Sequence, residues 1–226
     1  MKSRREKEPS RTGERGSRAQ AVPQAEMRDP KAVDHLIRAL SDKDEMVRSQ
    51  AARALGEMRD PKAVDHLIRA LKDRHKLVRA EAAEALGRVG DPLAVDHLVR
   101  SLKDENARVR GASARALGEI GDLQAVVAII GALKDRDEDV RGEAARALGK
   151  MGDERALSPL IDALRDIDTY VRCYATIALG TIGTPALDSL IQALKSDYED
   201  VRERAANTLA GMKDRAVEAL IRALSD

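Results

Sequence analysis

The sequence predicts an all-α protein built from tandem helical hairpins, and three observations support this fold class. The segment Glu26–Leu40 recurs letter for letter as Glu57–Leu71, an offset of 31 residues. Apolar residues inside the repeated segment follow the spacing of one helix face. Phe and Trp are absent and only three Tyr occur, although 43% of residues are hydrophobic. A core of Ala, Leu, Val and Ile without aromatics disfavours an all-β fold.

Steps of 31 residues divide residues 29–226 into repeated units. Units one to six begin at Asp29, Asp60, Asp91, Asp122, Asp153 and Thr184. Unit six is one residue short, and a half unit, Asp214–Asp226, closes the chain. We therefore expect one domain at 29–226, made of about six 31-residue hairpins plus a C-terminal half repeat.

Each unit begins with a first helix. In unit one, Pro30 suits a first helical turn, because the missing proline N–H would have no partner there. The apolar face of this helix is predicted to contain Val33, Leu36, Ile37 and Leu40.

A second helix follows in every unit. Asp44 is the predicted N-cap in unit one, and the same place is held by Asn106, Asp137 and Asp168. A glycine recurs near the end of this helix, at 56, 87, 118, 149 and 180, with Ala210 in unit six. The glycines at 90, 121, 152 and 183 are predicted C-terminal caps with positive φ. Small pairs such as Ala51 and Ala52 would let neighbouring helices approach closely.

The pattern D-P-x-A-V-x-x-L-I-x-A-L, followed by D-x-x-x-x-V-R-x-x-A-A-x-A-L-G, resembles the HEAT-like repeat of the phycobilisome-lyase (PBS lyase) type over residues 29–226. The resemblance implies a right-handed α-solenoid in which first helices line the convex side and second helices the concave side. Because one unit cannot bury its apolar face alone, stability would accumulate over interfaces between neighbouring units.

Residues 1–28 differ in composition from the repeats. They contain eight basic residues and four glutamates, a net charge of +4. The whole chain is at +1, so the remainder is at −3. Glycines and prolines interrupt any periodicity, and we expect a disordered tail to about residue 20. Residues 17–28 loosely resemble the end of a second helix and would form an imperfect cap on the stack.

An arginine follows the core valine of every second helix, and an aspartate stands six residues before it in five units. We expect a structural ladder of charge-assisted hydrogen bonds between adjacent units; the alternative is an anion-binding arginine row. The predicted ladder consists of Asp42, Arg48, Asp73, Arg79, Asp104, Arg110, Asp135, Arg141, Asp166, Arg172 and Arg202. Ser196 replaces the aspartate of unit six, so Arg202 is expected to lack a partner.

The sequence offers little support for catalysis, a metal or a cofactor, and none is expected. His35, His66 and His97 also recur at 31 residues. The outer two would lie roughly 20 Å apart on stacked helices, too far to share one ion; a surface site between two of them is the alternative. No common nucleophile, phosphate-loop or zinc motif occurs. Cys173 is the only cysteine and cannot form an internal disulfide, which fits a cytoplasmic location.

Variable positions on the second helices give the predicted binding site. Of thirty such residues in units one to four and six, nineteen are charged, whereas none of the six in unit five is. The predicted partner-binding patch consists of Thr169, Tyr170, Cys173, Tyr174, Ile177 and Thr181, with Tyr198 beside it. Tyrosine and apolar groups amid charge are typical of a binding hot spot, whereas the alternative is internal packing between units.

We therefore predict a non-catalytic cytoplasmic scaffold that binds a protein partner on its concave side. Self-association through units five and six is a second form of the same hypothesis. The resemblance implies one alternative, an accessory subunit of a bilin lyase. Another is binding of nucleic acid or an acidic partner by the basic tail; nucleic acid is not otherwise expected. No apolar run is long enough to span a bilayer, so no membrane role is expected.

Overall fold

The computed structural model describes residues 30–212, which form six helical hairpins. This range contains twelve α-helices and no strand, which confirms the predicted all-α solenoid. The first helices are α1 (Pro30–Ala39), α3 (Val64–Ala70), α5 (Val95–Ser101), α7 (Val126–Ala132), α9 (Leu157–Ala163) and α11 (Leu187–Ala193). The second helices are α2 (Glu45–Met58), α4 (Lys76–Val89), α6 (Ala107–Ile120), α8 (Glu138–Met151), α10 (Thr169–Ile182) and α12 (Glu199–Gly211).

The first helices of units two to six differ from the expected single α-helix, because each begins with a 3₁₀ turn. In unit two this turn is Pro61–Ala63, and the α-helix starts only at Val64. The carboxylate of Asp60 accepts a hydrogen bond from the N–H of Lys62 at 2.9 Å, and the Asp60 carbonyl accepts one from Ala63 at 3.0 Å. These tight local bonds favour the three-residue turn before the α-helix continues.

The predicted caps of the second helices are confirmed. The side chains of Asp44, Asn106, Asp137 and Asp168 each accept a hydrogen bond from a backbone N–H of the first helical turn. The four predicted C-terminal glycines all have positive φ, between 68° and 86°. Gly90, Gly121 and Gly152 are left-handed, and Arg59 adopts the same conformation in unit one, at φ 52°, whereas Gly183 combines its positive φ with a ψ of −135°.

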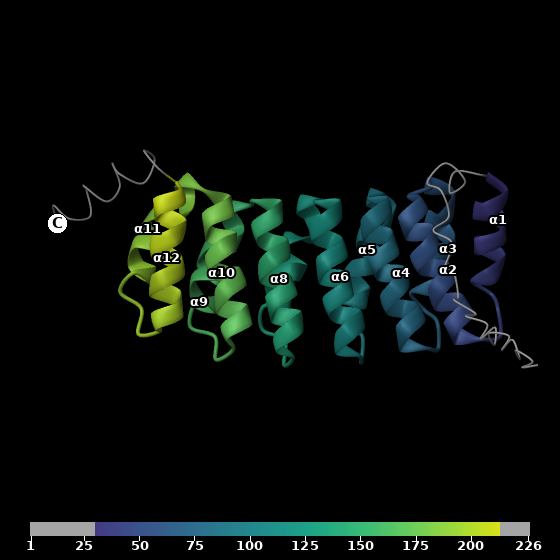
Figure 1. Cartoon of the computed structure of the whole chain (residues 1–226), viewed down its shortest axis with the longest axis horizontal. Helices are drawn as coiled ribbons and strands as arrows, with labels where there is room; N and C mark the ends of the chain where they lie inside the picture. Colours follow the sequence, from purple (N-terminus) through teal and green to yellow (C-terminus); the bar gives the residue numbers. More distant parts are fainter. Residues whose placement is uncertain (1–29, 213–226) are drawn as a thin grey trace, which may run out of the picture.

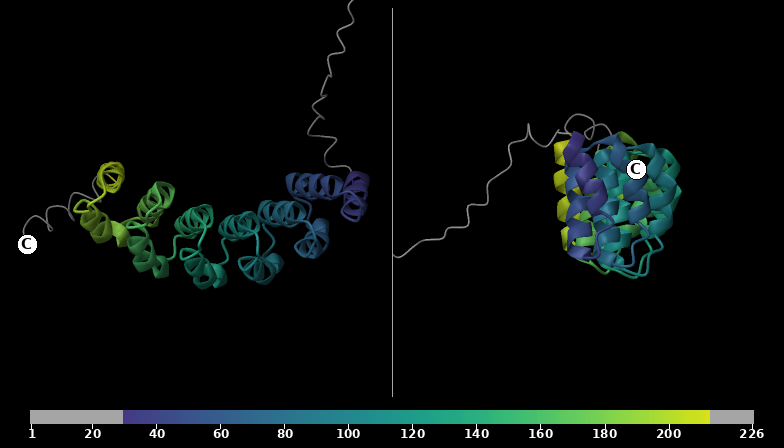
Figure 2. Two further views of the ribbon diagram at one scale, coloured as in Figure 1. Left: turned by 90° about the horizontal axis from the view of Figure 1, so that it is seen from below. Right: turned by 90° about the vertical axis from the view of Figure 1, so that its right-hand side faces the viewer.

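The hairpins stack side by side in a row (Figure 1), and the row curves in the left view of Figure 2. In the left view of Figure 2 the second helices lie on the inner side of the arc and the first helices on the outer side, as expected. The two ends of the row bend toward the same side. The inner surface is therefore a shallow concave face formed by α2, α4, α6, α8, α10 and α12.

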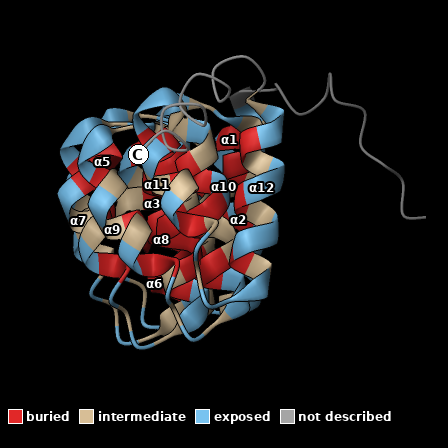
Figure 3. Ribbon diagram, turned by 90° about the vertical axis from the view of Figure 1, so that its left-hand side faces the viewer, coloured by how far each residue is buried: buried red, intermediate tan, exposed pale blue. Residues whose placement is uncertain are grey.

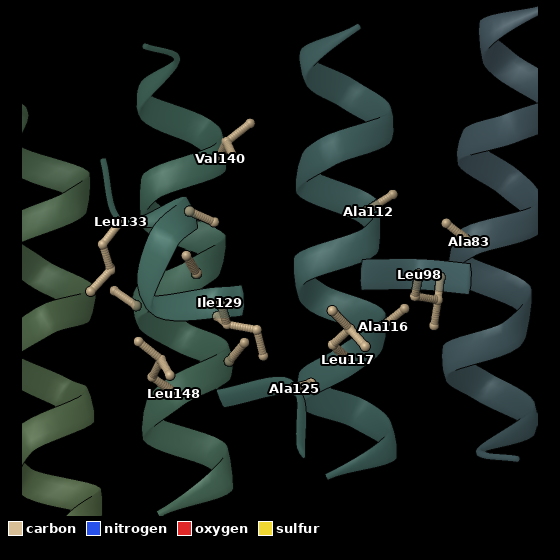
Figure 4. Close-up of a cluster of buried hydrophobic side chains, with 14 of the residues drawn as sticks. Ala83, Leu98, Ala112, Ala116, Leu117, Ala125, Ile129, Leu133, Val140 and Leu148 are labelled. Atoms are coloured by element: carbon tan, nitrogen blue, oxygen red, sulfur yellow. The ribbon is translucent and has the colours of Figure 1, made fainter. Parts of the chain in front are cut away.

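The core is one continuous layer between the two rows of helices (Figure 3). Each unit contributes a fully buried leucine from its second helix, such as Leu117 or Leu148. These side chains meet apolar residues of the first helices, such as Leu98 and Ile129 in Figure 4. Because the core extends through every interface, each unit is stabilised by its neighbours rather than by itself.

Second helices approach most closely at the recurring glycine. A Cβ added to Gly118 would lie 2.7 Å from the Cα of Ala147 on the next second helix. The same contact recurs between Gly56 and Ala85 and between Gly149 and Ala178. Glycine at this position lets the backbones of neighbouring helices touch, which explains dense packing without large aromatic side chains.

Three expectations lie outside the described residues. These are the disordered tail at 1–28, the cap at 17–28 and the half unit at 214–226. They stay predictions. Within the described residues, no helix is both long and apolar enough to cross a membrane.

Candidate functional site

All residues of the unit-five patch belong to α10, one of the helices on the inner side of the arc: Thr169, Tyr170, Cys173, Tyr174, Ile177 and Thr181. The carboxylate of Asp168 accepts hydrogen bonds from the N–H groups of Tyr170 at 2.8 Å and Val171 at 3.1 Å, which fixes the start of this helix. Tyr170 then remains 39% exposed and Ile177 remains 48% exposed. Thr169 and Thr181 are also exposed, whereas Cys173 and Tyr174 are half-buried. No member of the patch is fully buried.

Tyr170 reaches back onto the neighbouring unit. Its ring lies against Gly142 of α8, so closely that a Cβ at Gly142 would collide with it. The ring of Tyr174 meets the Tyr170 ring edge to face, with centroids 4.5 Å apart. The Tyr170 hydroxyl donates a long hydrogen bond of 3.4 Å to Glu143. Burial raises the pKa of the Tyr170 phenol well above its usual range, helped by the Tyr174 contact and the Glu143 charge.

The patch therefore combines the two alternatives, an exposed binding surface and internal packing between units. Tyr174 packs against the core, and one face of Tyr170 is used between units. The remaining surface of Tyr170 and nearly half of Ile177 face solvent. The accessible part of the patch is thus smaller than its six residues and centres on these two side chains.

Several charged residues of the neighbouring second helices pair with one another. Glu143 is 7% exposed and is held by Arg115 of α6 at 2.8 Å and by Arg146 at 2.9 Å. Further pairs on the second helices join Arg108 to Glu81, Arg88 to Glu84 and Lys150 to Glu119. This mutual pairing neutralises much of the concave face of units two to four.

The ladder forms in the predicted positions. Arg110 holds both carboxylate oxygens of Asp135 in the next unit, at 2.7 Å each, and donates to the backbone carbonyl of Asp104 in its own unit at 3.0 Å. Equivalent two-pronged pairs join Arg48 to Asp73, Arg79 to Asp104 and Arg141 to Asp166. Both partners of each rung are largely buried, so the arginine row is structural.

The rungs alter the acidity of their aspartates. Partial burial of Asp135 acts to raise its pKa, but hydrogen bonds from Arg110 and from the backbone N–H of Asp137 outweigh burial and lower the pKa below its usual value. The pKa of Asp73, Asp104 and Asp166 is lowered for the same reasons. Each of these carboxylates is therefore held in its charged form.

The prediction that Arg202 would be the arginine without a ladder partner was wrong. Each arginine pairs with the aspartate of the following unit, so Ser196 removes the partner of Arg172 rather than that of Arg202. Arg172 pairs instead with Asp200 of α12, at 3.1 and 3.2 Å. Arg202 is not free either, because it donates to the carbonyls of Ser196 and Asp197. Asp42 precedes the first rung, and within residues 30–212 its carboxylate accepts only the N–H of Asp44.

Tyr198 is joined to this altered rung. The Arg172 guanidinium lies 4.6 Å from the centre of its ring, and Tyr198 stays 39% exposed. This cation–π contact links the tyrosine of unit six to the helix that contains the patch. Thr169 accepts a further hydrogen bond from Arg172 at 3.0 Å.

One exposed apolar residue near the patch was missed. Ile167, in the turn before α10, is 90% exposed. The equivalent turn residues of the other units are all charged: Lys43, Arg74, Glu105, Arg136 and Asp197. The sequence contained this information. A comparison of the turn residues across the units would have shown that only unit five has an uncharged residue there, as it does at the variable positions of α10.

The recurring histidines do not come together. His35 is exposed, and His66 and His97 are partly exposed on successive first helices. Across residues 30–212, no group of three or more histidine, cysteine or acidic side chains is arranged to hold a metal ion.

Comparison with models of protein families shows which family the chain belongs to. The model for HEAT repeats matches residues 18–76, 33–113, 65–130, 101–172 and 158–226. The chain belongs to the HEAT-repeat family. A search of curated protein sequences found no match.

Solved structures show the same solenoid fold. An engineered protein is 25% identical, with a TM-score of 0.60 over 81% of this chain and 97% of the other. The complex of CpcE and CpcF of phycocyanin lyase from Nostoc sp. PCC7120 is 24% identical, with a TM-score of 0.63 over 93% of this HEAT-repeat chain and 82% of the other. A designed armadillo repeat protein is 18% identical, with a TM-score of 0.54 over 80% and 100% of the two chains.

Proposed function

We propose that this HEAT-repeat chain is a non-catalytic scaffold that binds a protein partner on its concave face, with the unit-five patch as the anchor. The observation that carries this proposal is the exposure of Tyr170 and Ile177 on a helix face without charge. Exposed aromatic and branched apolar side chains on a face without charge are typical of interface centres. We place the scaffold in the cytoplasm, because a lone cysteine fits a reducing compartment.

The neighbouring units favour a contact area larger than the patch itself. Arg115, Arg146 and Lys150 are already held by acidic partners on the same face. A partner that covers them would leave these pairs intact, so they would form a polar rim around the apolar centre. Rim charges of this kind contribute more to orientation and association rate than to affinity.

The test is a pull-down from the native lysate with the full chain and the double variant Tyr170→Glu, Ile177→Glu. We expect the double variant to lose the captured protein while it still unfolds in one cooperative transition, at a melting temperature lowered by the loss of the Tyr170 contacts with Gly142 and Tyr174. The matched control is Leu93→Glu, Val127→Glu, which places the same two charges on exposed apolar residues of the first-helix row. Equal capture by both double variants, or unfolding of the first, would contradict the proposal.

Self-association through units five and six is the second form of this proposal. In that case, the mass of the wild-type chain in light scattering would rise with concentration. The double variant would stay monomeric. A constant monomer mass for the wild-type chain would contradict self-association, and the proposed partner would then be a different protein.

A bilin-related accessory role is the second candidate function, favoured by the likeness to the CpcE–CpcF complex. The likeness at 24% identity shows the fold alone. A bilin held in the concave groove would change its visible absorbance on mixing with the chain. An unchanged spectrum at a several-fold excess of protein would count against this function.

The basic tail gives a third candidate, binding of nucleic acid or an acidic partner. Residues 1–28 lie outside the described residues, so this candidate rests on their net charge of +4 alone. It predicts binding that weakens steeply with salt and disappears when residues 1–28 are removed.

A further inference from the structure

The ladder changes its chemistry at one position. Ser196 stands where the five other units have aspartate. The backbone N–H of Tyr198 donates to the Ser196 hydroxyl at 3.3 Å, whereas the equivalent N–H groups donate to ladder carboxylates at 2.8–2.9 Å. Asp200 satisfies Arg172 from α12, so the ladder does not need a carboxylate at position 196.

A cleft lies at this place, between α9 and α11. Its volume is about 320 Å³, within the usual range of small-ligand sites. Leu164 and Tyr198 contribute apolar surface, and the walls include Gln192 and Ser196. The equivalent cleft between α3 and α5 is smaller, about 210 Å³, and contains the ladder carboxylate of Asp104 in its wall.

The charged groups of the larger cleft are mostly cationic. Arg165 and Lys195 line it, and their side chains make no ion pair or hydrogen bond within residues 30–212. The one carboxylate in the wall is Asp197, which is exposed. Replacement of the ladder aspartate by serine therefore removes a carboxylate from the wall and puts a hydroxyl donor there, beside the two unpaired cations.

We propose that this cleft binds the anionic group of a small amphiphilic ligand, a carboxylate or a phosphate. Arg165, Lys195 and the Ser196 hydroxyl would hold the anion, and the apolar part would lie against Leu164 and the Tyr198 ring. A guanidinium and an ammonium together suit either anion, because both offer charge-assisted hydrogen bonds. The cleft contains none of the six patch residues of α10, although Tyr198 lies beside both, and the site does not depend on the proposed function.

The three tyrosines make a direct test feasible. In the full chain labelled with 3-fluorotyrosine, each tyrosine gives one ¹⁹F resonance, which Tyr→Phe variants assign. The probes are benzoate, phenyl phosphate and neutral benzamide. We expect benzoate, phenyl phosphate or both to shift the Tyr198 resonance with saturation in the millimolar range, and benzamide to have no effect. The comparison of the two anions separates a carboxylate site from a phosphate site.

Variants of the cleft give opposite expected effects. Arg165→Gln or Lys195→Gln should weaken anion binding about tenfold, since each removes a charge-assisted hydrogen bond. Ser196→Asp should abolish it by restoring a carboxylate, whereas Asp197→Asn should strengthen it about threefold. The controls are Lys72→Gln and Lys103→Gln, which change the equivalent cations of the smaller cleft and should leave the Tyr198 shift unchanged.

Three results would overturn the proposal. One is the absence of any anion-dependent shift of Tyr198 up to about 20 mM of either anion. Another is an equal shift with benzamide, which would show that charge is not recognised. The third is unchanged binding in Ser196→Asp, provided that its melting temperature shows a folded protein.

Discussion

Neighbouring repeats are joined by arginine side chains, each of which binds both oxygens of one aspartate carboxylate. Arg110 and Asp135 make this contact across a unit boundary, and Arg110 also holds two backbone carbonyls of its own turn. One side chain therefore fixes a turn and an interface at once. Its removal leaves a buried partner charge, which costs more than the pair itself contributes.

Truncation of a rung should destabilise the chain. Asp135→Ala leaves the largely buried Arg110 guanidinium without its carboxylate, and we expect a loss of about 2–3 kcal/mol in the free energy of unfolding. Urea unfolding at pH 7 measures it. Glu138→Ala is the matched control, because this exposed acid begins α8 without a hydrogen-bond partner in residues 30–212, and it should cost less than about 0.5 kcal/mol.

The rungs also predict a pH dependence. The folded-state pKa of Asp73, Asp104, Asp135 and Asp166 lies below the unfolded value of about 3.9. Their stabilisation is therefore complete above about pH 4 and is lost as the pH falls through the lowered folded values. Urea unfolding from pH 7 to pH 2 should show this loss, and Asp135→Ala should flatten it. An identical slope in the variant would contradict the assignment.

Arg59 adopts a backbone conformation that side chains disfavour. Its φ of 52° matches the glycine caps of the later units, so Arg59→Gly should stabilise the chain by about 1 kcal/mol. The melting temperature measures the effect. A decrease would mean that the arginine side chain makes a contribution larger than the backbone strain.

At the scale of elements, stacking depends on glycine. The recurring glycine of each second helix was recognised in the sequence, but its role was not, because spacing within one unit does not show which backbone comes opposite. The same reason explains the misplaced broken rung: Arg172 is six residues from Asp166 but pairs with the following unit. Caps were predictable, since Asp168 and its partners are close in sequence.

The close approach of α6 and α8 gives a sharp prediction. Gly118→Ala would place a Cβ 2.7 Å from the Ala147 Cα, and the two helices must separate, at a cost of about 1–3 kcal/mol. Gly131→Ala is the control, because nothing lies within 4 Å of its added Cβ and alanine favours a helix by about 0.5–1 kcal/mol. Denaturant unfolding should move in opposite directions for the two variants. Equal effects would contradict the contact.

At the scale of the whole molecule, one repeat differs from the others, because the variable positions of its second helix contain no charge. Repetition predicted the number of hairpins and the position of the uncharged patch, and the resemblance to HEAT-like repeats implied that the second helices line the concave side. It did not predict that Tyr170 would pack onto Gly142, because that contact needs the side-chain conformation and the distance between units. The patch that remains accessible is consequently narrower than the sequence suggested.

The most direct test of the proposed concave site uses the labelled tyrosines again, now with the protein captured from the native lysate. All three tyrosines lie in or beside the patch, and an unlabelled partner is invisible in the ¹⁹F spectrum. We predict that the partner shifts or broadens the Tyr170 resonance of the wild-type chain and leaves the spectrum of Ile177→Arg unchanged. A captured partner that binds both chains equally and moves none of the three resonances would contradict the concave patch as the anchor.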